Sequence, residues 1–519
     1  MWRSCAAISA ALFTLCMPLK AAAQDVTLMS RDGGVEISGN LLGYDGEFYR
    51  VDTEYGELTV DGSGVTCDGP GCPNLSDFVA ELRMSGAAAM GEVMMPALLE
   101  AFAQRNGYET TREKNDGADF IYSLALKDSG DTEAIFEFGA TSTDEGFADL
   151  LANEADIVLS MREIRPDERK LARDAGMGDL SDGTRSRVIA LDAIVPIVSP
   201  GNPIRQISPQ NLAKTFAGQI DNWSDLGGPD APITLHLPDA STGLGQSVED
   251  RLLKPVDLPF ATKIVRHELS PMIAEAVLDD PFALGIASFA ETADAQVLTL
   301  SGPCGYTMEA DRQTIKTEDY PLTSPMFMYL PARRLPKVGR EFLAFLRTPA
   351  AQLVIRRAGF VDQTPEEISL NAQGQRFANA IDSAGPETTL EELQRMTRTL
   401  GPMRRLTTSF RFETGSIRLD AQSRSNVQQL ARALEIGTYD ARRLLFVGFS
   451  DGDGAATANR NIALRRSEAV RRAVAKAAEI ADLTRVTMDV DAFGEALPMA
   501  CDDSSWGRQA NRRVEVWIR

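Results

Sequence analysis

Histidine is almost absent from this sequence. The 519 residues include only His236 and His267. A Ser-His-Asp triad needs a histidine base, and zinc sites usually draw on several histidines or cysteines. We therefore expect a protein without enzymatic activity, without a metal site and without a cofactor.

Basic residues are also scarce relative to acids. Lysine and arginine total 53 against 74 aspartates and glutamates, which leaves a formal net charge of -21 at pH 7. Nucleic acids and anionic lipid surfaces attract basic proteins through their negative charge. Neither is therefore expected as a partner of this chain.

Apolar runs long enough to span a membrane are missing as well. Near the N-terminus, apolar residues extend only from about Ala6 to Met17, which is too short for a transmembrane helix. Arg3 precedes this run and three alanines at 21–23 follow it, as in a cleavable signal peptide. We predict a signal peptide at residues 1–23 and export of a soluble chain to the periplasm.

A lipoprotein signal at Cys16 is the alternative for the same segment. Leu15 stands before that cysteine, where a small residue is usual. Lipidation is therefore not the expected outcome.

Few cysteines remain beyond the predicted signal peptide: Cys67, Cys72, Cys304 and Cys501. Cys67 and Cys72 flank the turn "DGPG", and in an oxidising compartment we expect a disulfide between them. A zinc half-site is the alternative, but the chain offers too few histidines to complete it. A bridge between Cys304 and Cys501 is not expected, because nothing in the sequence places their segments in contact.

Strand and helix patterns divide the rest of the chain into parts. Residues 25–75 alternate β-formers with Gly and Asp turns, which predicts a small β-module that acts as a spacer. Strands alternate with helices over 82–361, which favours an α/β domain with mostly parallel strands. A polar linker follows at 362–404, with a helix at 390–400. A smaller α/β unit occupies 405–519.

Several stretches between 82 and 361 carry a family resemblance. They are "GAAAMGEVMMPALLEAF", "EADIVLSMREI", "YPLTSPMFMYLP" and, most specific, "FAGQIDNWSDLGG". The segment resembles the periplasmic substrate-binding proteins of phosphate ABC transporters. The resemblance implies a two-lobed periplasmic-binding-protein fold with the ligand between the lobes. Lobe one is expected near 82–194 and 285–361, and lobe two near 195–284.

The same resemblance implies a ligand site between the lobes. Its expected residues are Thr141, Ser142, Asp156, Thr242 and Gly243. Hydroxyls and backbone N–H groups at helix N-termini suit phosphate or another small anion.

Other positions of that site depart from the family pattern. Residues 87–89 are all alanine, Pro238 stands at the family's arginine, and Asp144 and Glu145 add negative charge. We therefore predict weak or absent phosphate binding. The alternatives are a phosphate receptor that delivers to an ABC permease, and a structural envelope protein that binds a protein partner.

One arginine near the C-terminus occupies an unusual position. At about 100° per residue, Ile462, Ala469 and Val470 fall on one face of a helix, and Arg466 lies in the middle of that face. Arg465 points to solvent. A buried guanidinium without a partner is costly, so taken alone Arg466 predicts a structural salt bridge.

The surrounding motifs resemble the OmpA-like peptidoglycan-binding domain. "GFSDGDG" matches that family's turn, the helix from Asn459 to Val470 matches its arginine helix, and "NRRVEVWI" matches its closing strand. The resemblance implies that Asp451 and Arg466, with Asn459 nearby, hold the diaminopimelate of the peptidoglycan stem peptide. A carboxylate can take its ammonium, and a guanidinium can grip its carboxylate. We therefore expect a periplasmic binding protein associated with the cell wall or outer membrane.

Overall fold

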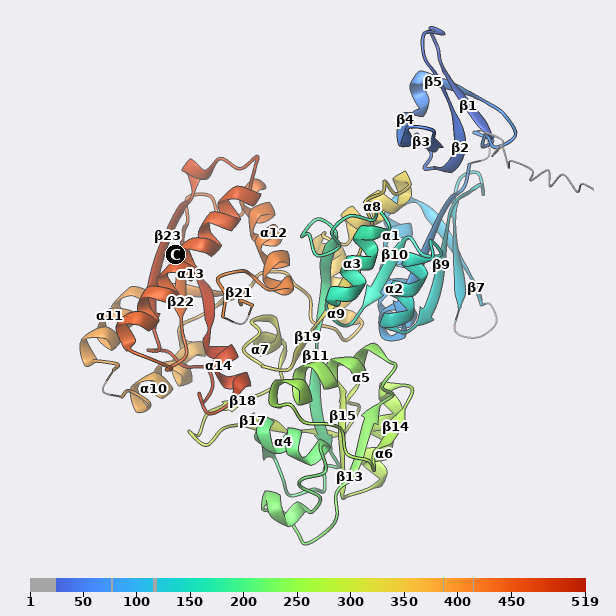
Figure 1. Ribbon diagram of the computed structural model, residues 1–519. Helices are drawn as coiled ribbons and strands as arrows, with labels where there is room; N and C mark the ends of the chain where they lie inside the picture. The colour runs from blue at the N-terminus through green and yellow to red at the C-terminus, as the bar shows by residue number, and fades with distance from the viewer. Residues whose placement is uncertain (1–24, 76–77, 115–118, 386, 414) are drawn as a thin grey trace, which may run out of the picture. The chain divides into compact units, whose positions relative to one another are not determined.

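The computed structural model describes residues 25–75, 78–114, 119–385, 387–413 and 415–519 (Figure 1). The predicted signal peptide at 1–23 lies outside these ranges. Within them, no helix has the length and apolar character needed to cross a membrane. The chain divides into two compact units, 1–80 and 81–519.

The first unit is a small antiparallel sheet with the strand order β4-β3-β2-β1-β5. Its strands are β1 (Val26–Ser30), β2 (Glu36–Tyr44), β3 (Phe48–Thr53), β4 (Gly56–Asp61) and β5 (Val65–Asp68). Leu28 and Val51 form the centre of its core. Cys67 and Cys72 are joined by a disulfide with their Cα atoms 5.8 Å apart. The β-rich character and the disulfide predicted for this segment are therefore confirmed.

The second unit begins with a large mixed sheet in the order β14-β13-β15-β11-β19-β10-β6-β9-β8-β7. The strands on the lobe-one side are β6 (Ala80–Ala87), β7 (Tyr108–Lys114), β8 (Phe120–Leu126), β9 (Thr132–Thr141), β10 (Ile157–Ser160) and β19 (Thr323–Tyr329). The strands on the lobe-two side are β13 (Thr234–Pro238), β14 (Val265–His267) and β15 (Ala283–Ser288). The long β11 (Ser186–Val198) belongs to both sides.

Helices cover this sheet in both lobes (Figure 1). Those of lobe one are α1 (Met95–Asn106), α2 (Thr143–Leu151), α3 (Pro166–Asp174), α8 (Lys337–Phe345) and α9 (Pro349–Arg357). Those of lobe two are α4 (Pro209–Phe216), α5 (Gly243–Val248) and α6 (Ser270–Asp279). The predicted helix at 95–106 ends as expected, because Gly107 adopts a left-handed conformation with φ 79°.

Strand pairing corrects two expectations for this domain. The strands are not mostly parallel: β10 pairs with β6 in parallel, but β11 pairs with both β15 and β19 in antiparallel fashion. The chain also returns to lobe one near Thr323, and not near 285. Residues 283–285, at the start of β15, pair with β13 in lobe two. A sequence pattern shows that a strand exists, whereas its partner depends on contacts distant in the chain.

The C-terminal domain is a sheet in the order β20-β21-β24-β22-β23. Its strands are β20 (Glu367–Ile368), β21 (Arg404–Phe410), β22 (Arg443–Phe449), β23 (Thr487–Gly494) and β24 (Arg513–Ile518). Its helices are α10 (Gly374–Asp382), α11 (Leu390–Leu400), α12 (Ala421–Glu435), α13 (Ala456–Ala477) and α14 (Ser505–Asn511). Asp420 caps α12 by accepting a hydrogen bond from the N–H of Ser423, as the sequence predicts.

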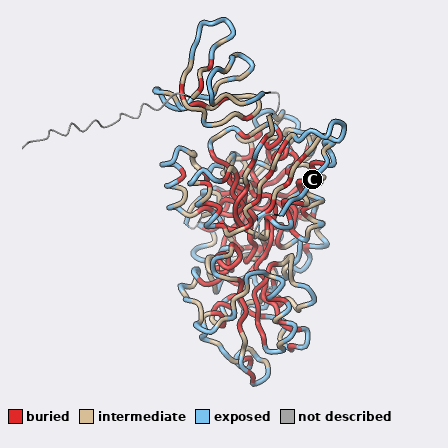
Figure 2. The backbone as a smooth tube through the Cα atoms, turned by 90° about the vertical axis from the view of Figure 1, so that its right-hand side faces the viewer, coloured by how far each residue is buried: buried red, intermediate tan, exposed pale blue. Residues whose placement is uncertain are grey.

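Both faces of this sheet are buried. Figure 2 shows buried segments gathered in the interior and exposed segments in the outer loops. Side chains alternate along a strand, so Leu444 and Phe446 of β22 pack with Val470 of α13 on one face. Leu445 and Val447 pack on the other face against Met396 of α11.

The second of these clusters corrects the expectation of a linker at 362–404. Leu393, Met396, Leu400 and Met403 are all buried in it. The predicted helix at 390–400 exists, but it forms a layer of the C-terminal domain. Its polar, Gln-rich sequence concealed a narrow apolar stripe of helical spacing.

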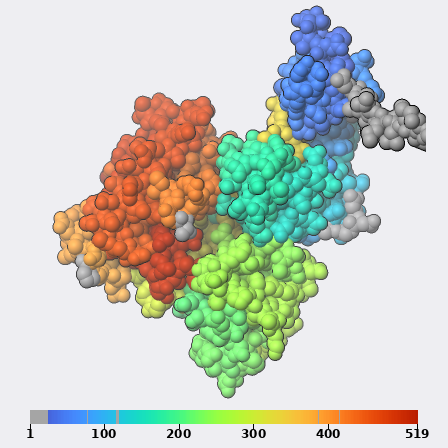
Figure 3. All heavy atoms as spheres, in the orientation of Figure 1, coloured from blue at the N-terminus to red at the C-terminus, as the bar shows by residue number. Residues whose placement is uncertain are grey.

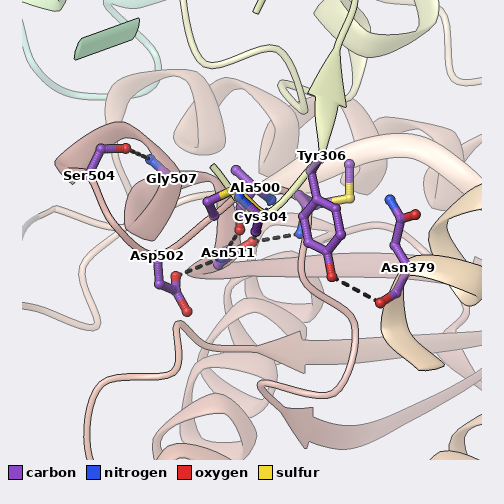
Figure 4. The surroundings of a disulfide bond; sticks show 10 residues. Cys304, Tyr306, Asn379, Ala500, Asp502, Ser504, Gly507 and Asn511 are labelled. Atoms are coloured by element: carbon purple, nitrogen blue, oxygen red, sulfur yellow. Dashed lines mark hydrogen bonds between the residues drawn. A yellow bond between two sulfur atoms is a disulfide. The ribbon is translucent and has the colours of Figure 1, made fainter. Parts of the chain in front are cut away.

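Cys304 and Cys501 form a disulfide, which corrects the expectation that these two cysteines are not bridged (Figure 4). Their Cα atoms lie 5.7 Å apart although 197 positions separate them. Beside the bridge, the hydroxyl of Tyr306 donates to the carbonyl of Asn379 at 2.9 Å. The C-terminal domain therefore packs against lobe two, a contact between distant segments that no local pattern reveals.

Contacts with lobe one complete this packing (Figure 3). Arg424 of α12 pairs with Glu163 at 2.9 Å, and the indole N–H of Trp506 donates to the Arg251 carbonyl of lobe two at 2.7 Å. Arg405 of β21 pairs with Asp319 at 2.9 Å. The C-terminal domain thus contacts both lobes of the preceding domain.

Replacing both Cys304 and Cys501 by serine is expected to destabilise the protein by about 5 kcal/mol, because the bridge closes a very long loop. The corresponding change at Cys67 and Cys72 should cost about 2 kcal/mol, because that loop is short. Thermal unfolding of the two double variants measures the difference. Peptide mapping without reduction that finds Cys304 and Cys501 as free thiols would contradict the pairing.

Candidate functional site

Arg466 of α13 is buried, with 4% of its surface exposed, whereas Arg465 is exposed. The helical register predicted for these two arginines is therefore confirmed. The Arg466 guanidinium carbon lies 4.9 Å from the centre of the Phe412 ring, and Nη2 donates to the Ser416 carbonyl at 3.3 Å. Its Nε is buried without a hydrogen-bond partner. No carboxylate of the described residues forms an ion pair with it, so the predicted structural salt bridge is not present.

Asp451 lies in the turn between β22 and α13 and is also buried. Its Oδ2 accepts a hydrogen bond from Arg512 Nε at 2.7 Å. Arg512 belongs to the "NRR" motif but was not among the predicted site residues. Its partnership with Asp451 depends on strand order, which the sequence does not show.

The electrostatics of this site favour an added anion. Burial lowers the pKa of Arg466, and the positive charge of Arg512 lowers it further, while Asp451 opposes both effects. A carboxylate placed beside Arg466 would relieve the burial of an unpaired charge.

Asn459 lies in the first turn of α13. Its Nδ2 donates to Glu495 Oε2 at 3.2 Å, and Asp502 accepts the Gly452 N–H at 2.7 Å. Burial raises the pKa of both Glu495 and Asp502. The turn that carries Asp451 is therefore surrounded by acids that the sequence motifs did not indicate.

Some of the residues predicted to bind a ligand between the two lobes lie close to one another. Ser142 caps α2 by accepting from the Glu145 N–H, and Thr242 caps α5 by accepting from the Gly245 N–H. The two helix N-termini meet closely, because a Cβ added at Gly243 would lie 2.7 Å from Thr143 Oγ1. Thr141 ends β9, and its hydroxyl is buried without a hydrogen-bond partner.

The chain's own side chains fill the space beside these helix ends. Buried Arg162 pairs with Asp144 in the first turn of α2, and with Glu168 at 2.6 Å. Gln246 of α5 accepts from Arg162 Nε at 2.7 Å and donates to Asp144 Oδ2 at 2.7 Å. The Asp144 carboxylate thus already accepts from both an arginine and an amide donor, the kinds of group that bind anions.

Asp156 does not join this group. It precedes β10, at the opposite end of that strand from Arg162, and accepts from the Arg83 N–H at 3.0 Å. It also pairs with Arg333 at 3.6 Å. Its placement before the start of β10, at the opposite end of that strand from Arg162, separates it from the other residues predicted for this site.

Comparison with known proteins agrees with this architecture. The profile of the PBP superfamily domain matches residues 74–349, which is more than half of the chain. The chain belongs to the PBP superfamily. The profile of the OmpA family matches residues 411–512, so the C-terminal domain is an OmpA domain fused to the PBP domain. PstS-like binding proteins and OmpA domains are non-enzymatic families of the periplasm or the cell envelope.

Curated relatives match the PBP domain at low identity. The phosphate-binding protein PstS of Borreliella burgdorferi is 24% identical over 195 residues, which cover 37% of this chain and 70% of that protein. The phosphate-binding protein PstS of Bacillus subtilis is 27% identical over 190 residues, which cover 36% of this chain and 61% of that protein.

Solved structures match each domain separately. A putative phosphate ABC transporter substrate-binding protein from Clostridium perfringens is 20% identical with a TM-score of 0.42, and the match covers 54% of this chain and 99% of that one. The peptidoglycan-associated lipoprotein from Burkholderia pseudomallei is 26% identical with a TM-score of 0.19, and covers 22% of this chain and 90% of that one.

Proposed function

We propose that this protein is a non-enzymatic binding protein of the cell envelope, exported to the periplasm, whose OmpA domain holds the PBP domain on peptidoglycan. The observation that carries the proposal is Arg466, a buried guanidinium whose Nε has no hydrogen-bond partner, and which forms no ion pair with a carboxylate, among the residues that the structure describes. Diaminopimelate carries an ammonium and a carboxylate on one carbon. Arg466 would bind that carboxylate, and Asp451 would accept from the ammonium, with Asn459 beside them.

Two kinds of peptidoglycan test this assignment directly. Stem peptides with lysine in place of diaminopimelate lack the carboxylate that Arg466 would bind. The full-length mature protein should co-sediment with diaminopimelate-type peptidoglycan and should remain in the supernatant with the lysine type. Equal sedimentation with both would contradict the role of Arg466.

We further propose that the PBP domain has lost the phosphate binding for which its PstS relatives are named. Asp144 already engages Arg162 and Gln246 between the helix ends, and its negative charge would repel a phosphate there. This leaves the domain to bind another small solute or a protein partner.

A phosphate receptor that serves an ABC permease is the second candidate, favoured by the names of the relatives. Isothermal titration of the mature protein with phosphate at pH 7 separates the two. We expect no measurable heat at micromolar phosphate. Micromolar binding that places the anion on Thr141, Ser142 and Thr242 would establish the receptor instead.

A further inference from the structure

A polar cavity of about 190 Å³ lies where both lobes of the PBP domain meet the OmpA domain. Glu163 comes from lobe one, Arg251 from lobe two, Glu318 from the connection between lobes, and Gln422 and Trp506 from the OmpA domain. This volume exceeds what a single water needs and leaves room for a small organic molecule. The cavity is separate from the helix ends between the lobes, whose residues do not line it.

Gln422 contributes an orphaned acceptor to this cavity. It is 4% exposed, and its Oε1 accepts no hydrogen bond. The orientation of its amide follows from its neighbour: Asn426 Nδ2 donates to the Ser409 carbonyl at 2.8 Å, so Asn426 Oδ1 is left to accept from Gln422 Nε2 at 2.9 Å. Turning the Gln422 amide would break this chain of hydrogen bonds. Its unpaired oxygen is therefore a fixed property of the fold.

Glu318 contributes a second orphaned acceptor. Its Oε1 is buried without a hydrogen-bond partner. Its backbone is left-handed, with φ 57°, a conformation that costs free energy for a residue other than glycine. Arg411 Nη2 donates to the Glu318 carbonyl at 2.7 Å, which holds this conformation in place. The fold thus maintains a strained glutamate whose Oε1 accepts no hydrogen bond from the described residues.

Arg251 contributes an unpaired cation. No described residue forms a hydrogen bond or an ion pair with its guanidinium, although Glu318 and Asp420 are near enough to attract it. Its backbone is held by Trp506, which donates to its carbonyl. The other charged groups are already engaged, since Glu163 pairs with Arg424 and Asp420 caps α12.

We propose that this cavity binds a small zwitterion of the α-amino acid class. Its carboxylate would pair with Arg251, and its ammonium would donate to Glu318 and Gln422. Phe327, Tyr320 and Trp506, which line the same space, would contact an apolar side chain. A ligand with one charge alone would leave either the guanidinium or the two acceptors unsatisfied.

Proton release provides an independent signature. Burial raises the pKa of Glu318 to about 8, with Asp420 and Asp319 acting in the same direction and Arg411 and Arg251 opposing. An ammonium beside it favours the ionised form, so binding at pH 7 should release a proton. Affinity should therefore rise between pH 7 and 8. Titrations in two buffers of different ionisation enthalpy measure the released proton.

The decisive experiment is equilibrium dialysis of the full-length mature protein against an equimolar mixture of the twenty L-amino acids. Mass spectrometry then identifies those that the protein retains. We expect one or a few to be retained. For each retained amino acid, the matched amine without the carboxylate and the matched acid without the amine should bind at least about tenfold more weakly, because each loses one charged partner.

Variants assign any retained amino acid to this cavity. Gln422→Leu and Arg251→Gln should each reduce retention about tenfold or more, whereas Gln428→Leu, an exposed site on the same helix, should not change it. Ala421→Leu places a larger side chain in the lining of the cavity without removing a polar group, and it should also reduce retention. This variant provides the test if Gln422→Leu or Arg251→Gln fails to fold. Retention of no amino acid, or equal retention by the wild type, Gln422→Leu and Ala421→Leu, would overturn the proposal and leave water as the occupant.

Discussion

Arg466→Ala is expected to weaken binding to diaminopimelate-type peptidoglycan by about 2–5 kcal/mol, which corresponds to roughly 30-fold or more. The variant removes the group that would pair with the ligand carboxylate in a buried site. Asp451→Ala should cause a loss of the same order by removing the partner of the ammonium. Co-sedimentation of the full-length chain at a series of peptidoglycan concentrations measures both effects.

Arg465→Ala is the matched control, because it removes the same charge from the adjacent, exposed position of the same helix. Its binding should stay close to that of the wild type. If Arg465→Ala abolished sedimentation while Arg466→Ala left it intact, the site assignment would be wrong.

The thermal stability of Arg466→Ala shows whether Arg466 binds a ligand or stabilises the fold. The Arg466 guanidinium is buried and forms no ion pair with a carboxylate in the described part of the chain, so its removal should leave the thermal midpoint unchanged or raise it. A large drop in the midpoint would show that Arg466 stabilises the fold. The full chain is needed here, because a fragment that starts at 405 lacks α11 and exposes Leu445 and Val447 on the sheet face that this helix covers.

Glu515→Gln should destabilise the OmpA domain by about 3–5 kcal/mol, the second large effect. Glu515 is fully buried in the middle of β24 and pairs with Arg513 at 2.7 Å and Arg405 at 3.4 Å, as well as with Arg376. Glutamine keeps the size but removes the negative charge, which leaves the three guanidinium groups buried around a neutral side chain. Thermal unfolding followed by circular dichroism measures the loss.

Asp489→Asn is the control, since it breaks the exposed pair of Asp489 on β23 with Arg443 on β22 of the same sheet. Exposed ion pairs contribute about 0–1 kcal/mol. Equal shifts for Glu515→Gln and Asp489→Asn would contradict the importance of the buried cluster.

The same cluster sets a pH dependence. Burial raises the pKa of Glu515, but Arg376, Arg405 and Arg513 outweigh it and hold the pKa below its ordinary value. Its stabilising contribution is therefore complete above the unfolded pKa of about 4.3 and is lost as pH falls through the folded pKa. The difference between wild type and Glu515→Gln should be constant from pH 7 to 5 and should shrink below pH 4.

Local features of this protein were predictable from the sequence. The cap at Asp420, the left-handed Gly107, the burial of Arg466 but not Arg465 and the bridge between Cys67 and Cys72 all follow from residues close together in the chain. Caps, helical periodicity and short loops are decided by neighbours within a few residues. The family motifs are local in the same sense.

The tertiary structure alone decided which distant segments meet. The α11 layer on the C-terminal sheet, the return to lobe one at Thr323 and the Cys304–Cys501 bridge each join segments far apart in the chain. Contacts within the two sites also join distant residues. Asp144 and Gln246 are separated by 102 positions in the chain, and Asp451 and Arg512 by 61. Many pairings of segments are compatible with the local sequence patterns. The observed pairings depend on burial and charge balance over the whole fold, because these requirements must be met by all segments at the same time.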